Sequence, residues 1–311
     1  ENDQPVTLGS GGQATTFLAK FTAFDKDVCL KQSKPYGANR KELELMVREA
    51  DVVKSLDHDQ IPKYIDSFLE ESPGGIGEEA RFYLASEFID GVTLQEYVEE
   101  NGKLSTEECL SIAREMLSPL DYIHNFKAED IDGVVHRDVN PKNIILGADQ
   151  NVYLVDFGIT KVNANETMNG TTTVGTIGYA SPEQLAGISD ARSDLYGLGA
   201  TLFYAATGVD PTTLSPMGTV GIKKRDLKKN LKGVDKKLKK VILKLLEDKP
   251  EKRYQSASEL ACELDGVEVD VEKHFQKELK DLQKDFIKYV KGSWKDIEKS
   301  KEQFGSSYDS E

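Results

Sequence analysis

The sequence predicts an α+β protein in which a β-rich N-terminal part precedes a larger helical part and a C-terminal amphipathic helix. Short apolar and β-branched runs fill the first 90 residues, and helical patterning begins beyond Asp90-Gly91. Near the end of the chain, apolar residues recur at 4, 3, 4, 3 spacing. We therefore expect three units: residues 1–89, 90–266 and 267–311.

The N-terminal unit contains predicted strands and one helix. A turn-like segment, 25–27, separates the first two strands, and apolar residues at helical spacing predict a helix over 41–56. The predicted strands are 16–21, 28–31, 64–68 and 82–88.

The second unit begins with a predicted helix from Thr93 to Glu100, and a longer helix follows. Ser105, followed three residues later by Glu108, has the pattern of a capping box and predicts the start of that longer helix. Residues 223–244 hold eleven basic residues in twenty-two, which predicts a local basic face.

The tail is predicted to form one long amphipathic helix. Docking on the helical part, pairing in a coiled coil and lying on an anionic membrane surface all remain open for it. Its apolar stripe comprises Phe275, Leu279, Leu282, Phe286 and Tyr289.

Composition and charge exclude several classes of protein. The 311 residues are 38% hydrophobic and 30% charged, which is typical of a soluble globular protein of about two domains. Mean hydropathy is −0.48, and no apolar run approaches the roughly 18 residues of a membrane-spanning helix. The net charge of −14 disfavours broad nucleic-acid binding.

The cysteines and the N-terminus bear on the compartment. Cys29, Cys109 and Cys262 are far apart and the four histidines are scattered, so neither a disulfide framework nor a zinc site is predicted. We expect a reducing, cytoplasmic location. The chain begins Glu1-Asn2-Asp3 without Met and without a basic-then-apolar leader, so we expect no signal peptide. This beginning is compatible with a segment excised from a longer protein, and anchoring through flanking segments remains open.

A glycine-rich segment lies between the first predicted strands. In a strand-turn-strand context, glycines let backbone N–H groups approach phosphate oxygens, whereas a dinucleotide-binding or Walker loop would open a helix. A plain glycine-rich hairpin turn is the alternative. The segment comprises Leu8, Gly9, Ser10, Gly11, Gly12, Gln13 and Ala14.

Two later motifs have the side chains that phosphoryl transfer requires. Lys31 ends a predicted strand, and Glu49 is suitably placed on the following helix to hold its ammonium against phosphates. Asp138 follows His136-Arg137 and is suited to orient an attacking hydroxyl and accept its proton. Asn143 and Asp156, the latter beginning Asp-Phe-Gly, supply oxygen ligands for Mg²⁺.

With these motifs in this order, residues 8 to about 264 resemble the protein kinase family. The resemblance implies a bilobal fold: a small antiparallel sheet of five strands with one helix, then a larger helical lobe, with ATP and Mg²⁺ in the cleft between them. It also implies that Asp194 braces the catalytic loop and that Glu183 pairs with Arg253. The chain looks most like bacterial and other microbial eukaryotic-like Ser/Thr kinases.

The resemblance also implies an adenine site. The peptide groups of Glu87 and Ile89 would hydrogen-bond adenine, with Ser86 as the gatekeeper. Cys29 is interpreted as a small core residue rather than a reactive thiol, since burial raises the pKa of a thiol. The lining side chains would be Thr16, Cys29 and Ile145.

The chain departs from the family pattern at two positions. Ala14 replaces the third glycine of the loop, and Asn140 stands where Ser/Thr kinases usually have Lys. Lys142, two residues later, provides a cation that could reach the transferring phosphate. Thr176, in Gly175-Thr176, favours Ser/Thr acceptors over tyrosine.

Regulation and partners are predicted from charge. Arg137 could pair with a phosphate on the activation loop, and we expect autophosphorylation there; a merely polar, disordered loop is the alternative. Protein substrates with Ser/Thr acceptors are expected, and the 223–244 region either recruits acidic or phosphorylated partners or is a solvated lysine face. The candidate phosphorylation sites are Thr167, Thr171, Thr172 and Thr173.

Two rival functions remain open from the sequence. A pseudokinase, which would bind nucleotide and act as a scaffold, has Asn140 and Ala14 in its favour but not the retained catalytic residues. A small-molecule kinase shares the catalytic pair but is not expected to keep Gly175-Thr176, Ser181-Pro182-Glu183 and Arg253.

Overall fold

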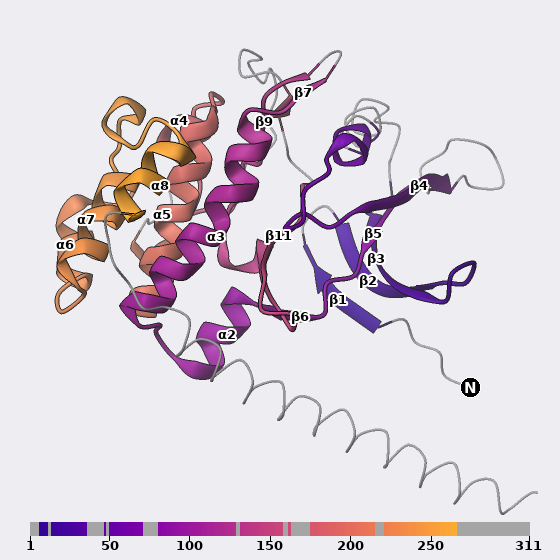
Figure 1. Ribbon diagram of the computed structural model, residues 1–311, viewed down its shortest axis with the longest axis horizontal. Helices are drawn as coiled ribbons and strands as arrows, with labels where there is room; N and C mark the ends of the chain where they lie inside the picture. Colours follow the sequence, from indigo (N-terminus) through magenta and orange to yellow (C-terminus); the bar gives the residue numbers. More distant parts are fainter. Residues whose placement is uncertain are drawn as a thin grey trace, which may run out of the picture.

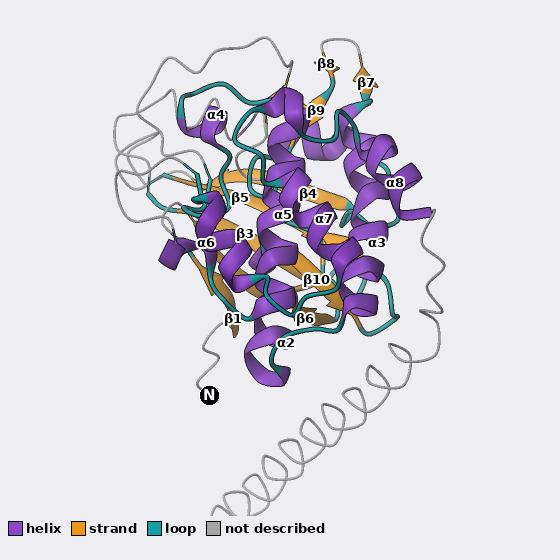
Figure 2. Ribbon diagram, turned by 90° about the vertical axis from the view of Figure 1, so that its left-hand side faces the viewer, coloured by secondary structure: helices purple, strands orange, loops and turns teal. Residues whose placement is uncertain are grey.

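A computed structural model describes residues 6–11, 14–35, 47, 50–70, 80–128, 131–157, 161–162, 175–214 and 221–265. An antiparallel sheet forms one part of the molecule and a group of helices the other (Figures 1 and 2). The predicted α+β class is therefore confirmed. The predicted tail helix over 267–311 lies outside the described residues.

The N-terminal sheet has five antiparallel strands in the order β1-β2-β3-β5-β4. Each of the four predicted strands is present, and β1 adds an edge strand. The strands are β1 (Val6–Ser10), β2 (Ala14–Phe21), β3 (Lys26–Ser33), β4 (Tyr64–Glu70) and β5 (Arg81–Glu87).

The turn between β2 and β3 lies earlier than predicted. It occupies residues 22–25, and the predicted turn residues Lys26 and Asp27 belong to β3. Lys20 lies opposite Asp27 in the ladder, and its ammonium is 3.2 Å from Asp25 Oδ1 and 3.5 Å from Asp27 Oδ1. Cross-strand pairing of opposite charges thus places Asp27 in the strand, although aspartate alone favours a turn.

The helix predicted over 41–56 is present where the structure describes it, at residues 47 and 50–55. Ala50 packs against Phe82 of β5, whereas Val52 and Val53 join the core of the helical part. This helix therefore contacts both parts of the molecule.

The helical part is built from α-helices and short strands. Strands β11, β10 and β6 form a small antiparallel sheet, and β12 pairs with β9. The α-helices are α2 (Leu94–Asn101), α3 (Thr106–His124), α4 (Pro182–Leu185), α5 (Ala191–Thr207), α6 (Lys224–Asn230), α7 (Lys236–Leu245) and α8 (Ala257–Asp265). The remaining elements are β6 (Gly91–Thr93), β7 (Lys127–Ala128), β8 (Ile131–Asp132), β9 (Val134–Val135), β10 (Ile144–Gly147), β11 (Val152–Leu154), β12 (Lys161–Val162) and the 3₁₀ turns η1 (Pro141–Asn143), η2 (Pro211–Leu214) and η3 (Pro250–Lys252).

The predicted capping box of α3 is confirmed. Ser105 Oγ accepts from the Glu108 N–H at 3.2 Å, and Glu108 Oε2 accepts from the Ser105 N–H at 2.6 Å. The helix predicted from Thr93 begins one residue later, because Thr93 ends β6 and caps α2. Each cap satisfies backbone donors that the first turn leaves without an intrahelical partner.

Helix α3 contains Pro119, which has no N–H to donate to the Glu115 carbonyl one turn earlier. Gln60, which precedes β4, donates its amide to that carbonyl at 3.1 Å and to the Val152 carbonyl at 3.0 Å. Because Pro119 cannot donate, the Glu115 carbonyl accepts from Gln60 instead, and this hydrogen bond connects the N-terminal part to the helical part.

Helix α5 is the centre of the helical core, with its residues from Ser193 to Ala206 buried. Two glycines allow its neighbours to approach closely. A Cβ on Gly197 would lie 2.6 Å from the Val139 carbonyl oxygen, and one on Gly199 would lie 2.6 Å from Leu245 Cβ. This helix, which contains Asp194, therefore packs directly behind the loop that contains Asp138.

Within the residues described above, the structure contains no helix both long and apolar enough to cross a membrane.

Candidate active site

The loop that contains Asp138 connects β9 to β10 through the short turn η1. Asn140 caps η1 by accepting from the Lys142 N–H at 2.9 Å. The turn places Asn143 beside Asp138, since the Asn143 side-chain amide donates to the Asp138 carbonyl and to Asp138 Oδ2, each at 2.9 Å. Local capping therefore decides which side chains surround the carboxylate.

Both carboxylate oxygens of Asp138 are oriented by donors. Oδ1 accepts from the Thr176 N–H at 3.1 Å and from the Thr176 hydroxyl at 2.8 Å, and Oδ2 accepts from Asn143. These three donors fix the direction in which the carboxylate points. Thr176 lies 38 residues further along the chain, so this geometry requires the activation segment to fold back onto the loop.

Asp194, at the start of α5, braces the same loop from behind, as the resemblance implies. Its oxygens accept from the backbone N–H groups of His136 at 2.9 Å and Arg137 at 2.7 Å, and His124 Nε2 lies 2.8 Å away. Arg137 has a φ of 69°, which is costly for a residue with a side chain, and the buried Asp194 holds it in that conformation.

Two further contacts position Arg137, and neither was predicted from the sequence. Arg137 Nε donates to the Ser189 hydroxyl at 2.9 Å, and the Gln184 amide donates to the Arg137 carbonyl. Asp138 follows directly, so these contacts fix the backbone that leads to the Asp138 carboxylate. The Pro-Glu-Gln sequence that ends at Gln184 was the one feature that could have indicated this contact. No local pattern, however, relates Gln184 to a residue 47 positions away.

Lys31 and Asp156 meet across the two parts of the molecule. The Lys31 ammonium forms an ion pair with Asp156 Oδ1, although 125 residues separate them. Lys31 lies in the central strand of the sheet, opposite Thr16 on β2 and Leu84 on β5. The predicted partner Glu49 lies outside the described residues, as do Gly12 and Gln13 of the glycine-rich loop.

Asp156 and Asn143 fit a bound magnesium ion by the chemistry of their oxygens. The Val155 N–H donates to the Asn143 carbonyl at 3.0 Å, which brings the two residues to neighbouring positions, and Asp156 has a φ of 64°. The Asn143 side-chain nitrogen is used toward Asp138, which leaves its Oδ1 as the ligand atom. Mg²⁺ bound to a nucleotide typically takes one or two protein ligands besides phosphate and water oxygens, so two such residues suffice.

The glycines of the β1–β2 hairpin are not explained by packing. Neither Gly9 nor Gly11 has a positive φ, and a Cβ on Gly9 would meet no atom within 4 Å. A Cβ on Gly11 would lie 3.8 Å from the Ala14 carbonyl, an ordinary contact. Neither backbone conformation nor packing in this structure therefore requires glycine at these two positions.

The predicted adenine-site residues Cys29 and Ser86 face each other on β3 and β5. Burial raises the pKa of the Cys29 thiol, with the Asp156 charge acting in the same direction and the Ser86 hydrogen bond and Lys31 opposing it. This direction agrees with an unreactive thiol, but Cys29 is only half-buried and is not one of the buried core residues. The Glu87 N–H donates to the Lys63 carbonyl at 2.8 Å, so this N–H is already used within the protein.

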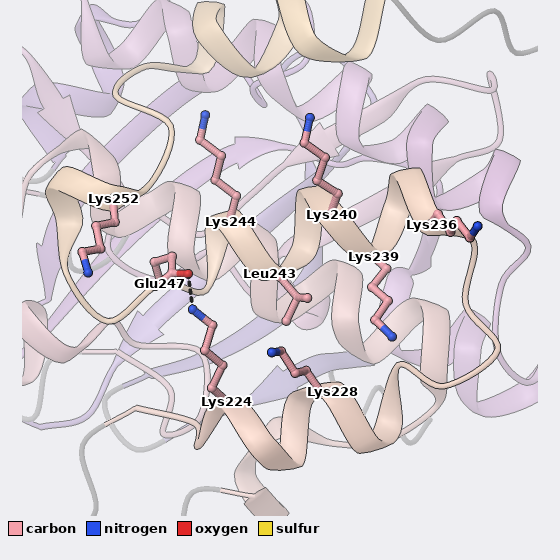
Figure 3. A pocket seen from close by; sticks show the side chains of 9 residues that line it. All are labelled: Lys224, Lys228, Lys236, Lys239, Lys240, Leu243, Lys244, Glu247 and Lys252. Carbon is pink, nitrogen blue, oxygen red and sulfur yellow. Dashed lines mark hydrogen bonds and ion pairs between the residues drawn. The ribbon is translucent and has the colours of Figure 1, made fainter.

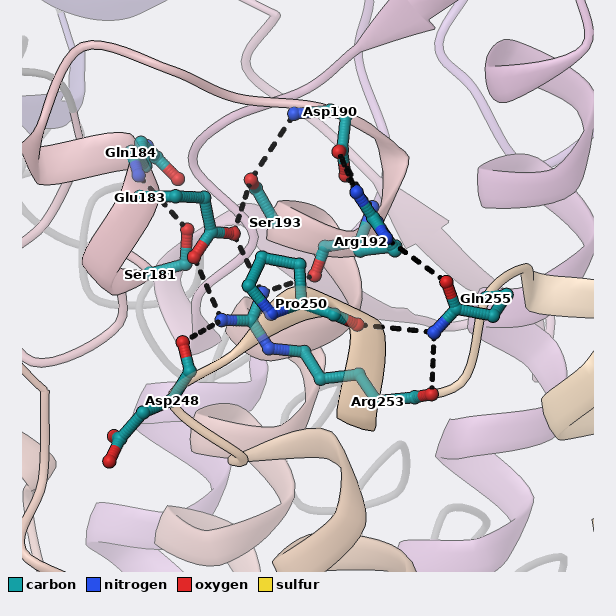
Figure 4. Close-up of polar contacts among 10 residues, drawn as sticks. All are labelled: Ser181, Glu183, Gln184, Asp190, Arg192, Ser193, Asp248, Pro250, Arg253 and Gln255. Carbon is teal, nitrogen blue, oxygen red and sulfur yellow. Dashed lines mark hydrogen bonds and ion pairs between the residues drawn. The ribbon is translucent and has the colours of Figure 1, made fainter.

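Glu183 and Arg253, which the resemblance pairs, form a buried ion pair (Figure 4). Arg253 Nη1 lies 2.6 Å from Glu183 Oε1, and Nη2 lies 2.8 Å from Oε2. The remaining guanidinium donors reach the carbonyls of Glu247, Arg192 and Asp248. Since this bidentate pair joins the end of the activation segment to the turn η3, it ties two distant segments together.

Comparisons with known proteins show the family to which the chain belongs. The family model described as "Protein kinase domain" matches residues 3–263. Serine/threonine-protein kinase D of Synechocystis is 36% identical over 271 residues, which cover 81% of this chain and 49% of that protein. Serine/threonine-protein kinase PknB of Mycobacterium tuberculosis is 32% identical over 267 residues, covering 83% and 41%. Serine/threonine-protein kinase PrkC of Bacillus subtilis is 30% identical over 266 residues, covering 83% and 39%.

The chain thus spans half or less of the length of these relatives. Because the family model matches most residues of this chain, the chain belongs to the protein kinase family.

Proposed function

We propose that this chain transfers the γ-phosphoryl group of ATP to serine and threonine hydroxyls of proteins. The observation that carries the proposal is the Asp138 carboxylate, held by Thr176 and Asn143 beside the Lys31–Asp156 pair. The relatives named above as serine/threonine-protein kinases support the same reaction.

Asp138 orients the acceptor hydroxyl and accepts its proton as the oxygen attacks the γ-phosphorus. The bond from that phosphorus to the bridging oxygen breaks, and ADP leaves. The protein contributes mainly position and charge in such a reaction, since the transition state spreads negative charge over the phosphoryl oxygens. Lys142, exposed on η1, supplies a cation toward that charge.

The residues that hold Mg²⁺·ATP follow from the same geometry. Asn143 and Asp156 would hold the metal ion, which would supply positive charge against the negative charge that develops on the phosphoryl oxygens. Lys31 and the glycine-rich backbone hold the phosphates, and the Glu87 carbonyl with the Ile89 peptide group holds adenine. The side chains that line the base are Thr16, Cys29, Ser86 and Ile145.

Thr176 carries the proposed preference for serine and threonine. Its hydroxyl donates to Asp138, so this residue fixes the segment beside which the acceptor lies.

The three cysteines are free thiols, which supports the proposal that this domain works in the reducing cytoplasm. The proposed boundary at residue 90 is supported by β6, which pairs with β10 of the helical part.

Autophosphorylation of the activation loop is the first expected result. Arg137 is buried beside Asp138, and a phosphate of about −1.5 to −2 charges opposite its guanidinium would order the loop. The four candidate threonines, Thr167, Thr171, Thr172 and Thr173, lie outside the described residues. After incubation with Mg²⁺·ATP, mass spectrometry should find phosphate on at least one of them. An active enzyme without phosphate at any of the four would contradict this regulation.

Asn140 is expected to position the catalytic loop rather than to replace the cation that is usual at its site. It is 2% exposed, donates to the Asp138 carbonyl at 3.0 Å and the Thr176 hydroxyl at 3.3 Å, and caps η1. Asn140→Ala should therefore lower stability by about 1–2 kcal/mol through the lost cap. The value of kcat should fall by about tenfold, because Asp138 and Thr176 lose a common partner.

Lys142→Ala is the matched comparison, since Lys142 is exposed and a purely electrostatic role predicts lower kcat with unchanged melting temperature. Melting curves and steady-state rates separate the two roles. An Asn140→Ala variant with unchanged kcat would show that Asn140 is not a positioning residue.

A further inference from the structure

A groove lined by lysines lies between α6 and α7, on the helices farthest from the sheet (Figures 1 and 3). Its lining comprises seven lysines, one glutamate and one leucine. These residues are Lys224, Lys228, Lys236, Lys239, Lys240, Leu243, Lys244, Glu247 and Lys252.

The amphipathic sequence of α7 explains how the groove forms. Leu238, Val241, Ile242 and Leu245 are buried, and Leu245 lies where Gly199 of α5 leaves room for it. The lysines therefore lie on the opposite faces of the helix. Lys239 of α7 and Lys228 of α6 point into the groove on either side of the half-buried Leu243.

The protein neutralises only part of this charge itself. Lys224 pairs with Glu247, and on the other side of α7, Lys240 and Lys244 lie 2.6 Å from Glu263 and 2.9 Å from Glu259. Lys228 and Lys239, which point into the groove, form no ion pair anywhere in the described part of the chain. The same holds for Lys236 and Lys252 at its ends.

We propose that this groove binds an acidic segment of a protein partner, at a site separate from the one that binds the acceptor hydroxyl. The argument is charge complementarity, because four lysines without an acidic partner surround one groove in a chain whose net charge is −14. Leu243 between the cations favours a peptide with an apolar side chain over an inorganic anion.

The size of the partner follows from the range of these charges. At physiological salt the attraction of the lysines extends about 8 Å, so a short acidic segment bound in the groove interacts mainly with them. A long polyanion would also lie close to the acidic rest of the chain, which would repel it. This is the reason to prefer a peptide to nucleic acid.

The test measures binding directly and needs no phosphoryl transfer. A fluorescein-labelled peptide of Asp and Glu with two leucines, and without Ser, Thr or Tyr, is titrated with the full chain and followed by anisotropy. The double variant Lys228→Glu/Lys239→Glu should weaken binding by about tenfold, and higher salt should weaken binding to the unmodified chain. Circular dichroism establishes that the variant is folded.

The matched control is Lys26→Glu/Lys103→Glu, which makes the same change in net charge at two exposed lysines in β3 and before α3. It should bind the peptide within about twofold of the unmodified chain, since a charge beyond the screening length contributes little. If both double variants lost peptide affinity equally, net charge alone would explain the loss and the proposal would be overturned. The proposal would also be overturned if the groove bound inorganic phosphate more tightly than the peptide. The same holds if the chain bound phosphatidylserine vesicles more tightly and only the groove variant lost that binding.

Failure of this proposal is distinguishable from failure of the kinase proposal. Peptide binding lost only in the groove variant supports the groove even if the chain has no kinase activity. Conversely, phosphoryl transfer without any peptide binding rejects the groove and leaves the kinase proposal intact.

Discussion

Asp138→Asn is expected to reduce phosphoryl transfer by about a thousandfold, because the variant has no carboxylate to accept the proton of the attacking hydroxyl. Asparagine retains an oxygen for Thr176, which donates from its N–H and its hydroxyl. Its amide nitrogen, however, would face the Asn143 donor that now contacts Oδ2 at 2.9 Å. Two opposed donors disturb the site locally and leave the fold intact.

The measurement is incorporation of radiolabelled phosphate into the chain and into a generic Ser/Thr substrate. Binding of Mg²⁺·ATP, followed as a rise in melting temperature, should persist in Asp138→Asn. Lys31→Ala should lose both transfer and most of that rise, since Lys31 holds the phosphates. This contrast separates chemistry from nucleotide binding.

The pseudokinase alternative has its own outcome in the same experiment. If the unmodified chain transfers no phosphate to itself or to substrates while Mg²⁺·ATP still raises its melting temperature, nucleotide binding is its function and the kinase proposal is wrong. Rates of Asp138→Asn equal to those of the unmodified chain would equally remove Asp138 from its proposed role.

Arg253→Ala is expected to destabilise the fold by about 3–5 kcal/mol, because it leaves the Glu183 carboxylate charged without its partner in a site that is 14% exposed. It also removes donors from three backbone carbonyls, those of Glu247, Arg192 and Asp248. At this chain length such a loss lowers the melting temperature by about 10 °C, measurable by calorimetry or urea unfolding.

The dependence on pH gives this prediction a second readout. Burial alone raises the pKa of Glu183, but the hydrogen bond and charge of Arg253 outweigh it and hold the pKa below the ordinary value of 4.5. A lowered pKa stabilises the fold above pH 4.5, and this contribution is lost as the pH falls through the folded-state value. The difference in unfolding free energy between the unmodified chain and Arg253→Ala should therefore be largest near neutral pH. It should shrink as the pH falls, because burial raises the pKa of the unpaired Glu183 in the variant and protonation then removes its buried charge.

The double variant Arg253→Met/Glu183→Leu is the control. With both charges removed, no carboxylate is left buried and unpaired, so it should cost clearly less than Arg253→Ala. A double variant as unstable as the single one would show that the carbonyl contacts, and not the ion pair, account for the loss.

Local patterns in the sequence were sufficient for most individual elements. The strands around Lys31 and the capping box at Ser105 depend on residues within about four positions of each other, the distance over which propensity and side-chain pairing act. The turn predicted at 25–27 was wrong at Lys26 and Asp27, because a contact between strands decided their place. The charge pair of Asp27 with Lys20 on the neighbouring strand placed Asp27 in β3.

Much of the site depends on contacts that no local pattern contains. Asp194 reaches the loop 57 residues before it, and Arg253 reaches Glu183 across 70 residues. Both pairs were predicted only through the resemblance to protein kinases. The contacts of Ser189 and Gln184 with Arg137 were missed, because neither residue type distinguishes a buried partner from an exposed polar residue.

The sequence by itself determined the α+β class, the order of the motifs and the chemical types available for phosphoryl transfer, since these follow from residue identity and short-range periodicity. Only the tertiary structure decided that Asn140 is buried between Asp138 and Thr176. It also decided that Lys228 of α6 and Lys239 of α7 point into one groove. The physical reason is that direction and burial of a side chain are set by packing against residues distant in sequence, here around α5, whose glycines fix how closely its neighbours approach.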